Sequence, residues 1–223
     1  MQALFVVLLV ILCAQAEVAF AESLRAQAQA ENPAAVSTAT LAAVAPKAAV
    51  APKVAASPKA KKQGPQAKDA PSSAEVMKAL DDWGKGLVAV STAKVDGGNY
   101  VQAATDMVNM AYNYDEGIVL FKPTVAKDIP FRTTFEGALS YFVGDNADFP
   151  EDTGFAIKTA WKSVGFDVAG IVYGTNRALV QTKTTLTKTD NTTVVVYFSM
   201  SFTRKSKKDP LKIELHHSSL PPV

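Results

Sequence analysis

The chain has 223 residues, with 23 Lys and Arg, 21 Asp and Glu, and a formal net charge of +2 at pH 7. This near-neutral balance excludes a strongly basic nucleic-acid-binding protein. The single cysteine, Cys13, lies in an apolar N-terminal stretch, and the two histidines, His216 and His217, are adjacent near the C-terminus. These counts leave a following domain without a disulfide or thiolate, and they exclude a zinc centre built from several His and Cys ligands.

Residues 1–21 are typical of a secretory signal peptide. An unbroken apolar run extends from Ala3 to Ala14, and small residues follow it up to an Ala-Phe-Ala end. The run is shorter than the roughly 20 apolar residues that a membrane-spanning helix needs. It lacks the usual basic residue before the run, so an uncleaved membrane anchor stays the alternative.

Residues 22–71 form an irregular Ala/Pro/Lys repeat with seven Lys and Arg against three Asp and Glu. The segment has no aromatic residue, so it buries too little surface to offset its chain entropy, and we expect a disordered linker or a basic transit peptide. The stretch EVAFAE around Phe20 resembles the junction of bipartite plastid leaders in algae with secondary plastids. This resemblance implies a plastid location, and secretion or a periplasmic location is the alternative.

Residues 72–223 have the length of one ordinary domain and a net charge of −1. Ser72 and Glu75 have the spacing of a capping box, at the start of a helix predicted over 74–93. Apolar residues recur on one face of this helix at steps of three and four: Val76, Leu80, Trp83, Leu87 and Val90. The same periodicity predicts a second helix over 99–113.

Strands dominate the second half of the domain. A short strand is predicted at 118–124 and a third helix at 134–144. Four runs rich in Val, Thr, Ile and aromatic residues follow, at 160–174, 177–188, 192–205 and 211–219. Turn residues between the runs indicate antiparallel hairpins. This order predicts an α+β domain in which a curved antiparallel sheet wraps around the N-terminal helices and encloses a pocket at its open end.

Alternation along the last strand separates the two histidines. Ile213, Leu215, His217 and Ser219 share one face, and Lys212, Glu214, His216 and Ser218 share the other. The first face is apolar until His217, so we expect His217 and Ser219 to face the pocket. We expect His216 on the surface or at an interface, and histidines on opposite faces cannot share a metal ion.

The stretch LHHSSLP at the end of this strand, together with FKPT at 121–124 and FRTTFEGALSYFVG at 131–144, resembles the iota-class carbonic anhydrases. The resemblance covers 75–222 and extends to the cone-shaped α+β superfamily of the nuclear transport factors and the association domain of calcium/calmodulin-dependent kinase II. It implies interconversion of CO2 and bicarbonate without a metal or other cofactor. It also implies a homodimer formed through the outer face of the sheet. The net charge of the domain predicts no nucleic-acid partner, and we expect no membrane partner for the mature form.

The resemblance implies a pocket made by a threonine, a tyrosine, and a histidine and a serine of the last strand. The matching residues are Thr124, Tyr141, His217 and Ser219, and alternation selects the last two independently. We expect His217 to take a proton from water as the water oxygen attacks CO2, while the three hydroxyls donate to the forming bicarbonate.

Alternatives stay open for the site and for the function. Thr133, Thr134 and Ser140 are near the proposed residues, and the pair His216 and Ser218 faces the pocket if the strand register is off by one. A non-catalytic association domain that binds a small ligand has the same architecture. An isomerase of the ketosteroid type needs a carboxylate base in an apolar pocket, whereas alternation directs Glu214 away from the core. A Ser-His hydrolase lacks its G-x-S-x-G turn here.

Overall fold

The computed structural model describes residues 67–222. The predicted signal peptide, 1–21, and most of the predicted linker lie outside the described residues. Residues 67–71, the end of that linker, contact the domain, because the Asp69 carbonyl accepts hydrogen bonds from the Asn176 N–H and from Arg204 Nη2, both at 3.2 Å. None of the helices in the described part of the chain has the length and apolar character needed to span a membrane.

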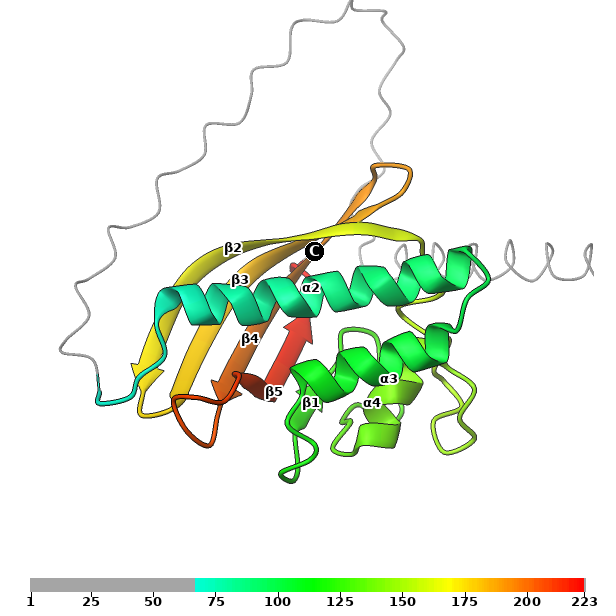
Figure 1. The fold of residues 1–223 in the computed structure, drawn as a ribbon. Helices are drawn as coiled ribbons and strands as arrows, with labels where there is room; N and C mark the ends of the chain where they lie inside the picture. Colours follow the sequence, from blue (N-terminus) through cyan, green and yellow to red (C-terminus); the bar gives the residue numbers. More distant parts are fainter. Residues whose placement is uncertain (1–66, 223) are drawn as a thin grey trace, which may run out of the picture. The chain divides into compact units, whose positions relative to one another are not determined.

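Helices precede the long strands, as predicted for an α+β domain (Figure 1). The described elements are α2 (Ser73–Val95), α3 (Tyr100–Ala111), β1 (Leu120–Lys122), α4 (Phe135–Val143), β2 (Trp161–Gly174), β3 (Arg177–Lys188), β4 (Thr193–Thr203) and β5 (Lys212–Ser219). Every predicted helix and strand in this region is therefore confirmed, with bounds that differ by a few residues at most.

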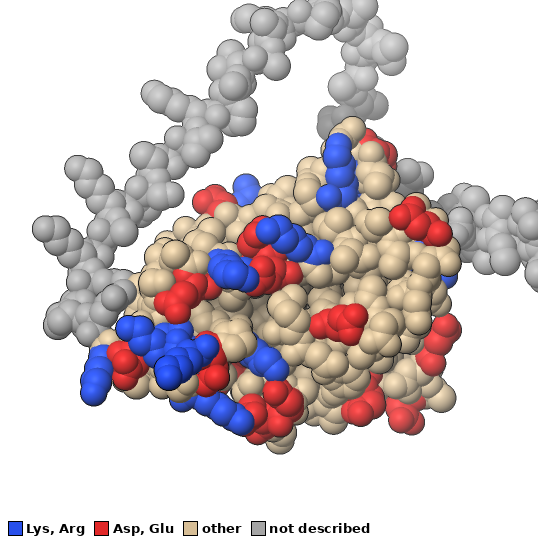
Figure 2. Space-filling view, in the orientation of Figure 1, with Lys and Arg blue, Asp and Glu red and all other residues tan. Residues whose placement is uncertain are grey.

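The predicted capping box starts α2. Ser72 Oγ accepts a hydrogen bond from the Glu75 N–H at 3.2 Å, and the Glu75 carboxylate accepts one from the Ser72 N–H at 2.7 Å. All five apolar positions predicted for the inner face of α2 are buried. Figure 2 shows positive and negative side chains interspersed on the face that it displays, and i,i+4 ion pairs Lys78–Asp82 and Lys85–Asp81 lie on α2. Both signs of charge therefore alternate on this face, which fits the near-neutral composition.

The five strands form one sheet in the order β1-β5-β4-β3-β2. Strands β2 to β5 make the predicted antiparallel meander, but β1 pairs in parallel with β5, so the sheet is mixed at this edge. The prediction of a wholly antiparallel sheet is incomplete because the parallel pair joins residues 95 positions apart, such as Leu120 and Leu215, and no local pattern in the sequence indicates such a pairing. Figure 1 shows α2 lying across the sheet, with α3 and α4 grouped beside β1.

A β-bulge interrupts β5 near its start. Phe202 of β4 pairs with Ile213, whereas the adjacent Ser201 pairs with Leu215, so Glu214 is an extra residue on the β5 side. The Glu214 carboxylate accepts from Arg177 Nε at 2.8 Å and Nη2 at 3.0 Å, and from Ser201 Oγ at 2.7 Å. These bonds hold the extra residue in place.

The bulge reverses the expected orientation of the last strand. Ile213 is buried, as predicted, but beyond the bulge the buried residues are His216, at 2% exposure, and Ser218, at 3%. His217 is exposed and Ser219 is only half-buried. The prediction that His217 and Ser219 face the core is therefore wrong, because strict alternation counted from Ile213 does not continue across an inserted residue.

Candidate functional site

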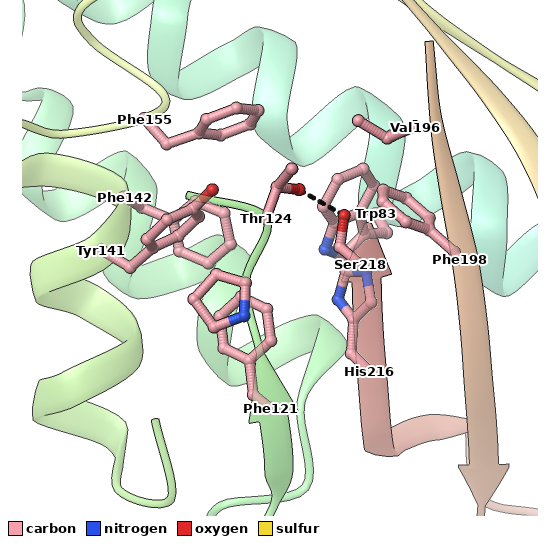
Figure 3. Close-up of a pocket in the computed structure, with 11 residues that line it drawn as sticks. Trp83, Phe121, Thr124, Tyr141, Phe142, Phe155, Val196, Phe198, His216 and Ser218 are labelled. Carbon is pink, nitrogen blue, oxygen red and sulfur yellow. Dashed lines mark hydrogen bonds between the residues drawn. The ribbon is translucent and has the colours of Figure 1, made fainter. Parts of the chain in front are cut away.

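A small cavity, with about 10 Å³ open to the centre of a water molecule, lies where the end of β5 meets β1, β4, α2 and α4 (Figure 3). Most of its wall is apolar and aromatic, and includes Trp83, Phe121, Phe142, Phe155, Val196 and Phe198. Four other lining side chains carry hydroxyl or imidazole groups: Thr124, Tyr141, His216 and Ser218. The cavity thus combines an apolar wall with a few converging polar groups, as small-ligand sites do.

The structure brings two of the predicted site residues to this cavity and not the other two. Thr124 and Tyr141 line it, whereas His217 and Ser219 lie on the other face of β5 and their places are taken by His216 and Ser218. The pairing of β1 with β5 brings the residues after Lys122 to the end of β5, which places Thr124 next to Ser218.

The alternatives named for the threonine and tyrosine have other roles. Thr134 caps α4 by accepting from the Gly137 N–H at 3.2 Å, and Ser140 Oγ donates to Asp152 Oδ2 at 2.7 Å. Thr133 is exposed. None of these three side chains lines the cavity.

The His216 ring is held among aromatic side chains. Phe121 stacks on it with ring centroids 5.1 Å apart, and Phe198 meets it edge to face at 4.4 Å. Nδ1 of His216 lies 2.9 Å from the Tyr112 hydroxyl, which in turn accepts a hydrogen bond from Trp83 Nε1 at 3.0 Å. The other ring nitrogen, Nε2, is buried and has no hydrogen-bond partner among the residues that the structure describes.

Burial controls the ionisation of the site. It lowers the pKa of His216 to about 3, with a smaller contribution from the charge of His217, so the ring is neutral at physiological pH. Burial likewise raises the pKa of both Tyr112 and Tyr141 above the ordinary value, so both phenols stay protonated. The cavity therefore presents neutral hydrogen-bonding groups.

This burial predicts how stability depends on pH. Above the unfolded-state pKa of ~6.5, His216 is neutral in both states and adds no pH dependence. As pH falls below ~6.5 the unfolded chain takes up a proton that the native ring refuses until about pH 3, so the free energy of unfolding falls by up to ~1.4 kcal/mol per pH unit. Urea unfolding of the protein and of His216→Gln at pH 7, 6 and 5 measures this contribution.

The variant should lose ~1–2 kcal/mol less stability than the unchanged protein between pH 7 and 5. The carboxyls of Glu75 and Glu151, whose pKa values are held at about 2, lose their stabilising effect only below their ordinary value of 4.5, outside this window. Equal losses in the two proteins would mean that the native His216 ring takes up the proton.

The hydroxyls of Thr124 and Ser218 are hydrogen-bonded to each other across the cavity (Figure 3). Each hydroxyl has one proton and two acceptor positions. Beyond the bond between them, the pair can therefore donate one hydrogen bond to another group and accept others. Ser218 is buried and Thr124 is only half-buried, so the pair leads from the interior of the cavity to its more exposed side.

A carboxylate network fixes the loop that follows Thr124. Glu151 accepts from the backbone N–H groups of Lys127, Asp128 and Ile129 at 2.7, 2.9 and 2.9 Å. Burial acts to raise the pKa of Glu151, but these hydrogen bonds and one from Arg132 outweigh it and hold the pKa at about 2. The buried Arg132 also binds Asp152 at 2.8 Å, and this network ties the Thr124 loop to the helix of Tyr141.

Within residues 67–222, no group of three or more His, Cys, Asp or Glu side chains is placed to hold a metal ion. No carboxylate is among the residues that line the described cavity. Neutral donors beside an apolar wall are suited to a small uncharged molecule and to an anion with several oxygen acceptors.

A sequence model of the metal-independent carbonic anhydrases matches residues 74–220. The metal-independent carbonic anhydrase of Nostoc sp. strain PCC 7120 is 39% identical over 160 residues, which cover 70% of this chain and 77% of that protein.

A solved structure gives the same family. The crystal structure of an iota-carbonic anhydrase from a cyanobacterium, complexed with bicarbonate, is 38% identical with a TM-score of 0.67 and covers 72% of this chain and 99% of that one. A putative calcium/calmodulin-dependent protein kinase II association domain from Xanthomonas campestris is more distant, at 20% identity and a TM-score of 0.42 over 68% of this chain and 89% of that one. The resemblance to the iota class is therefore confirmed, and the chain belongs to the metal-independent carbonic anhydrase family.

Proposed function

We propose that the protein interconverts CO2 and bicarbonate without a metal ion, in the cavity lined by Thr124, Tyr141, His216 and Ser218. The observation that carries the proposal is the convergence of these four neutral polar side chains on a small, otherwise apolar cavity. Family membership supports the reaction, and the cavity supports its location. A non-catalytic association domain does not need such a group of converging donors.

CO2 and the negative charge that develops during its hydration suit two different parts of the cavity wall. CO2 carries no charge, so it suits the aromatic side of the cavity, which includes Phe121 and Phe198. As water attacks the carbon, negative charge grows on the CO2 oxygens, and fixed hydrogen-bond donors stabilise that charge most strongly in the transition state. Tyr141, which stays protonated, and the His216 ring are placed on the cavity wall to supply such bonds.

Hydration forms one C–O bond, moves the electron pair of one C=O bond onto its oxygen, and releases a proton from the attacking water. The pKa of His216, about 3, makes the ring a poor acceptor for that proton. Full transfer from water, with a pKa of ~15.7, would cost ~17 kcal/mol at ~1.36 kcal/mol per pKa unit. The base role expected for a histidine therefore fits this cavity poorly.

The hydroxyl pair offers a route for the proton. Ser218 accepts the proton of the attacking water while it passes its own proton to Thr124, and Thr124 passes one to solvent at the more exposed side of the cavity. No residue keeps a net charge, because each hydroxyl gains one proton and loses one. The step is concerted with C–O bond formation, so free hydroxide does not form.

The proposal predicts that activity survives removal of metal ions. The purified full chain, dialysed exhaustively against a chelator and checked by elemental analysis, should hydrate CO2 at the same rate as before treatment. The rate is measured by stopped flow with a pH indicator, and added Zn²⁺ should not raise it. Loss of activity on chelation and its return with Zn²⁺ would overturn the metal-independent reaction.

The outer face of the sheet is the proposed homodimer interface. Val172 and Leu179, which pair across β2 and β3, are 66% and 50% exposed, and Tyr197 on β4 is 41% exposed. An apolar outer face of this kind supports burial against a second copy. Light scattering coupled to gel filtration should give a dimer, and a dimeric Leu179→Lys, Val172→Lys variant would contradict this interface.

Residues 1–71 support a route into the secretory pathway and from there to a plastid, on the basis of their composition and the EVAFAE stretch. A fluorescent protein fused to residues 1–71 and expressed in an alga with secondary plastids tests this location. Fluorescence in the cytosol would contradict the leader, and fluorescence outside the cell would favour secretion.

A further inference from the structure

Three buried side chains from different parts of the fold form a continuous hydrogen-bonded row at the cavity, with Trp83 and His216 in its wall. Trp83 comes from α2, Tyr112 follows the end of α3, and His216 lies on β5. Trp83 Nε1 is 3.0 Å from the Tyr112 hydroxyl, which is 2.9 Å from Nδ1 of His216. Tyr112 is 1% exposed, so water does not readily replace either partner.

The donor and acceptor inventory of the row allows one arrangement that satisfies Trp83 Nε1, the Tyr112 hydroxyl and Nδ1 of His216 together. An indole N–H only donates, so the Tyr112 oxygen accepts from Trp83 and has one proton of its own to give. If Nδ1 of His216 carried the proton, Tyr112 would accept from both sides, and its own buried proton would lack an acceptor among the described residues. Nε2 of His216 lacks a partner among the described residues in either case, so the alternative adds a second unsatisfied buried group, and Tyr112 therefore donates to Nδ1.

The free end of the His216 ring then has a defined state. A neutral imidazole carries one proton, and with Nδ1 acting as acceptor this proton is on Nε2. Nε2 is the atom without a hydrogen-bond partner in residues 67–222, on a ring that lines the cavity. It is therefore available to a ligand as an N–H donor.

We propose that Trp83 and Tyr112 are positioning residues that hold His216 in the Nε2–H tautomer, so that His216 donates a hydrogen bond to a bicarbonate oxygen and does not take the proton of the attacking water. The identity of the ligand rests on the proposed function, whereas the tautomer rests on the hydrogen-bonded row alone. A buried group that orients a catalytic imidazole and selects its tautomer acts in this way in other enzymes.

Trp83 and Tyr112 also pack against the His216 ring. Trp83 meets the His216 ring edge to face, with centroids 5.6 Å apart, and Tyr112 stacks on it at 6.1 Å. Packing thus fixes the plane of the ring, and the hydrogen bond from Tyr112 fixes its proton. Both are needed for the Nε2–H to keep one direction as charge develops on the ligand.

Nitrogen NMR of the full chain labelled with 15N-histidine tests the tautomer directly. At pH 7, His216 should show an unprotonated Nδ1 and a protonated Nε2, and Tyr112→Phe should shift the ring towards a mixture of both tautomers. A protonated Nδ1 in the unchanged protein would overturn the inference, and so would a Tyr112→Phe ring that keeps the original signature and full activity.

Activity measurements, with a neighbouring tyrosine as the control, distinguish a positioning role of Tyr112 from a general structural role. Tyr112→Phe should lower kcat for CO2 hydration about 10-fold, in keeping with loss of an orienting hydrogen bond. Trp83→Phe should give a smaller loss in the same direction and serves if Tyr112→Phe does not fold. The control is Tyr114→Phe, which removes a hydrogen bond of 2.7 Å to the Arg132 carbonyl from a neighbouring tyrosine and should keep the tautomer and the rate.

The two possible failures are distinguishable. If the tautomer is as stated but the chelated protein does not hydrate CO2, the proposed function is wrong and the row stands as a structural finding. If the protein hydrates CO2 but carries the proton on Nδ1, this inference alone is wrong and His216 has an acceptor facing the cavity.

Discussion

Replacement of His216 by alanine should lower kcat for CO2 hydration by about 100-fold or more, as loss of one preorganised donor does in other active sites. Replacement of the adjacent His217 should leave kcat within about twofold of the unchanged protein, because this side chain is exposed on the opposite face of β5. The two variants remove the same side chain from neighbouring positions, so the second controls for the strand itself. Stopped-flow assays of both metal-depleted proteins measure the difference.

His216→Ala also leaves the Tyr112 hydroxyl unpaired and opens space among Phe121 and Phe198, so its stability needs its own measurement. His216→Gln refills part of this space and keeps polar atoms near Tyr112. Thermal unfolding followed by circular dichroism establishes that each variant is folded at the assay temperature. A folded His216→Gln with full activity, or a large loss in His217→Ala, would show that the chemistry is not on the His216 face.

Removal of the hydroxyl pair should have an effect of similar size. Thr124→Val keeps the shape of the side chain and removes its hydroxyl, so kcat should fall about 100-fold if Thr124 passes the proton onward. Ser218→Ala should cause a comparable loss. Because both hydroxyls serve the same step, the double variant should be only slightly slower than either single variant, as expected for residues that act as a unit.

Ser219→Ala is the matched control for Ser218→Ala. Ser219 is the next residue on β5 and pairs with Tyr197 on β4, outside the cavity lining. Its variant should keep kcat within about twofold, since surface substitutions away from a site have small effects. Fully additive losses in the Thr124→Val, Ser218→Ala protein would mean that the two hydroxyls act in separate steps, and the shared proton route would be wrong.

The elements of the fold follow from local patterns in the sequence. The capping box of Ser72 and Glu75 and the apolar face of α2 depend on residues three or four positions apart, and both are present as predicted. The meander of β2 to β5 likewise depends on strand and turn composition. The parallel pairing of β1 with β5 has no such local signature, because it depends on how the whole sheet closes over the helices.

The sequence predicts only part of the site, because some of its residues depend on contacts between distant segments. Thr124 and Tyr141 followed from a family resemblance, and both line the cavity. Alternation selects the histidine that does not line the cavity, because the bulge at Glu214 depends on the register between β4 and β5 and on an ion pair with Arg177, 37 residues earlier in the chain. A charged residue between Ile213 and Leu215 gave no local sign that the alternation would change.

The supporting residues were beyond the reach of sequence patterns. Periodicity only places Trp83 on the apolar face of a helix, and Tyr112 lies near the end of a predicted helix without any motif around it. Their hydrogen bonds to one another and to His216 join positions 29 and 104 residues apart. The signal that the sequence offers is that both side chains carry a polar atom, which needs a hydrogen-bond partner when it is buried. The fold decides which residue that partner is.

A crystal structure of the metal-depleted protein soaked with bicarbonate tests the central claim most directly, because it locates the ligand relative to both faces of β5. We predict bicarbonate in the cavity, with one oxygen within hydrogen-bond distance of His216 Nε2 and others near the hydroxyls of Thr124 and Tyr141. Bicarbonate bound beside His217 on the outer face, or held by a metal ion that survives chelation, would contradict the proposed site.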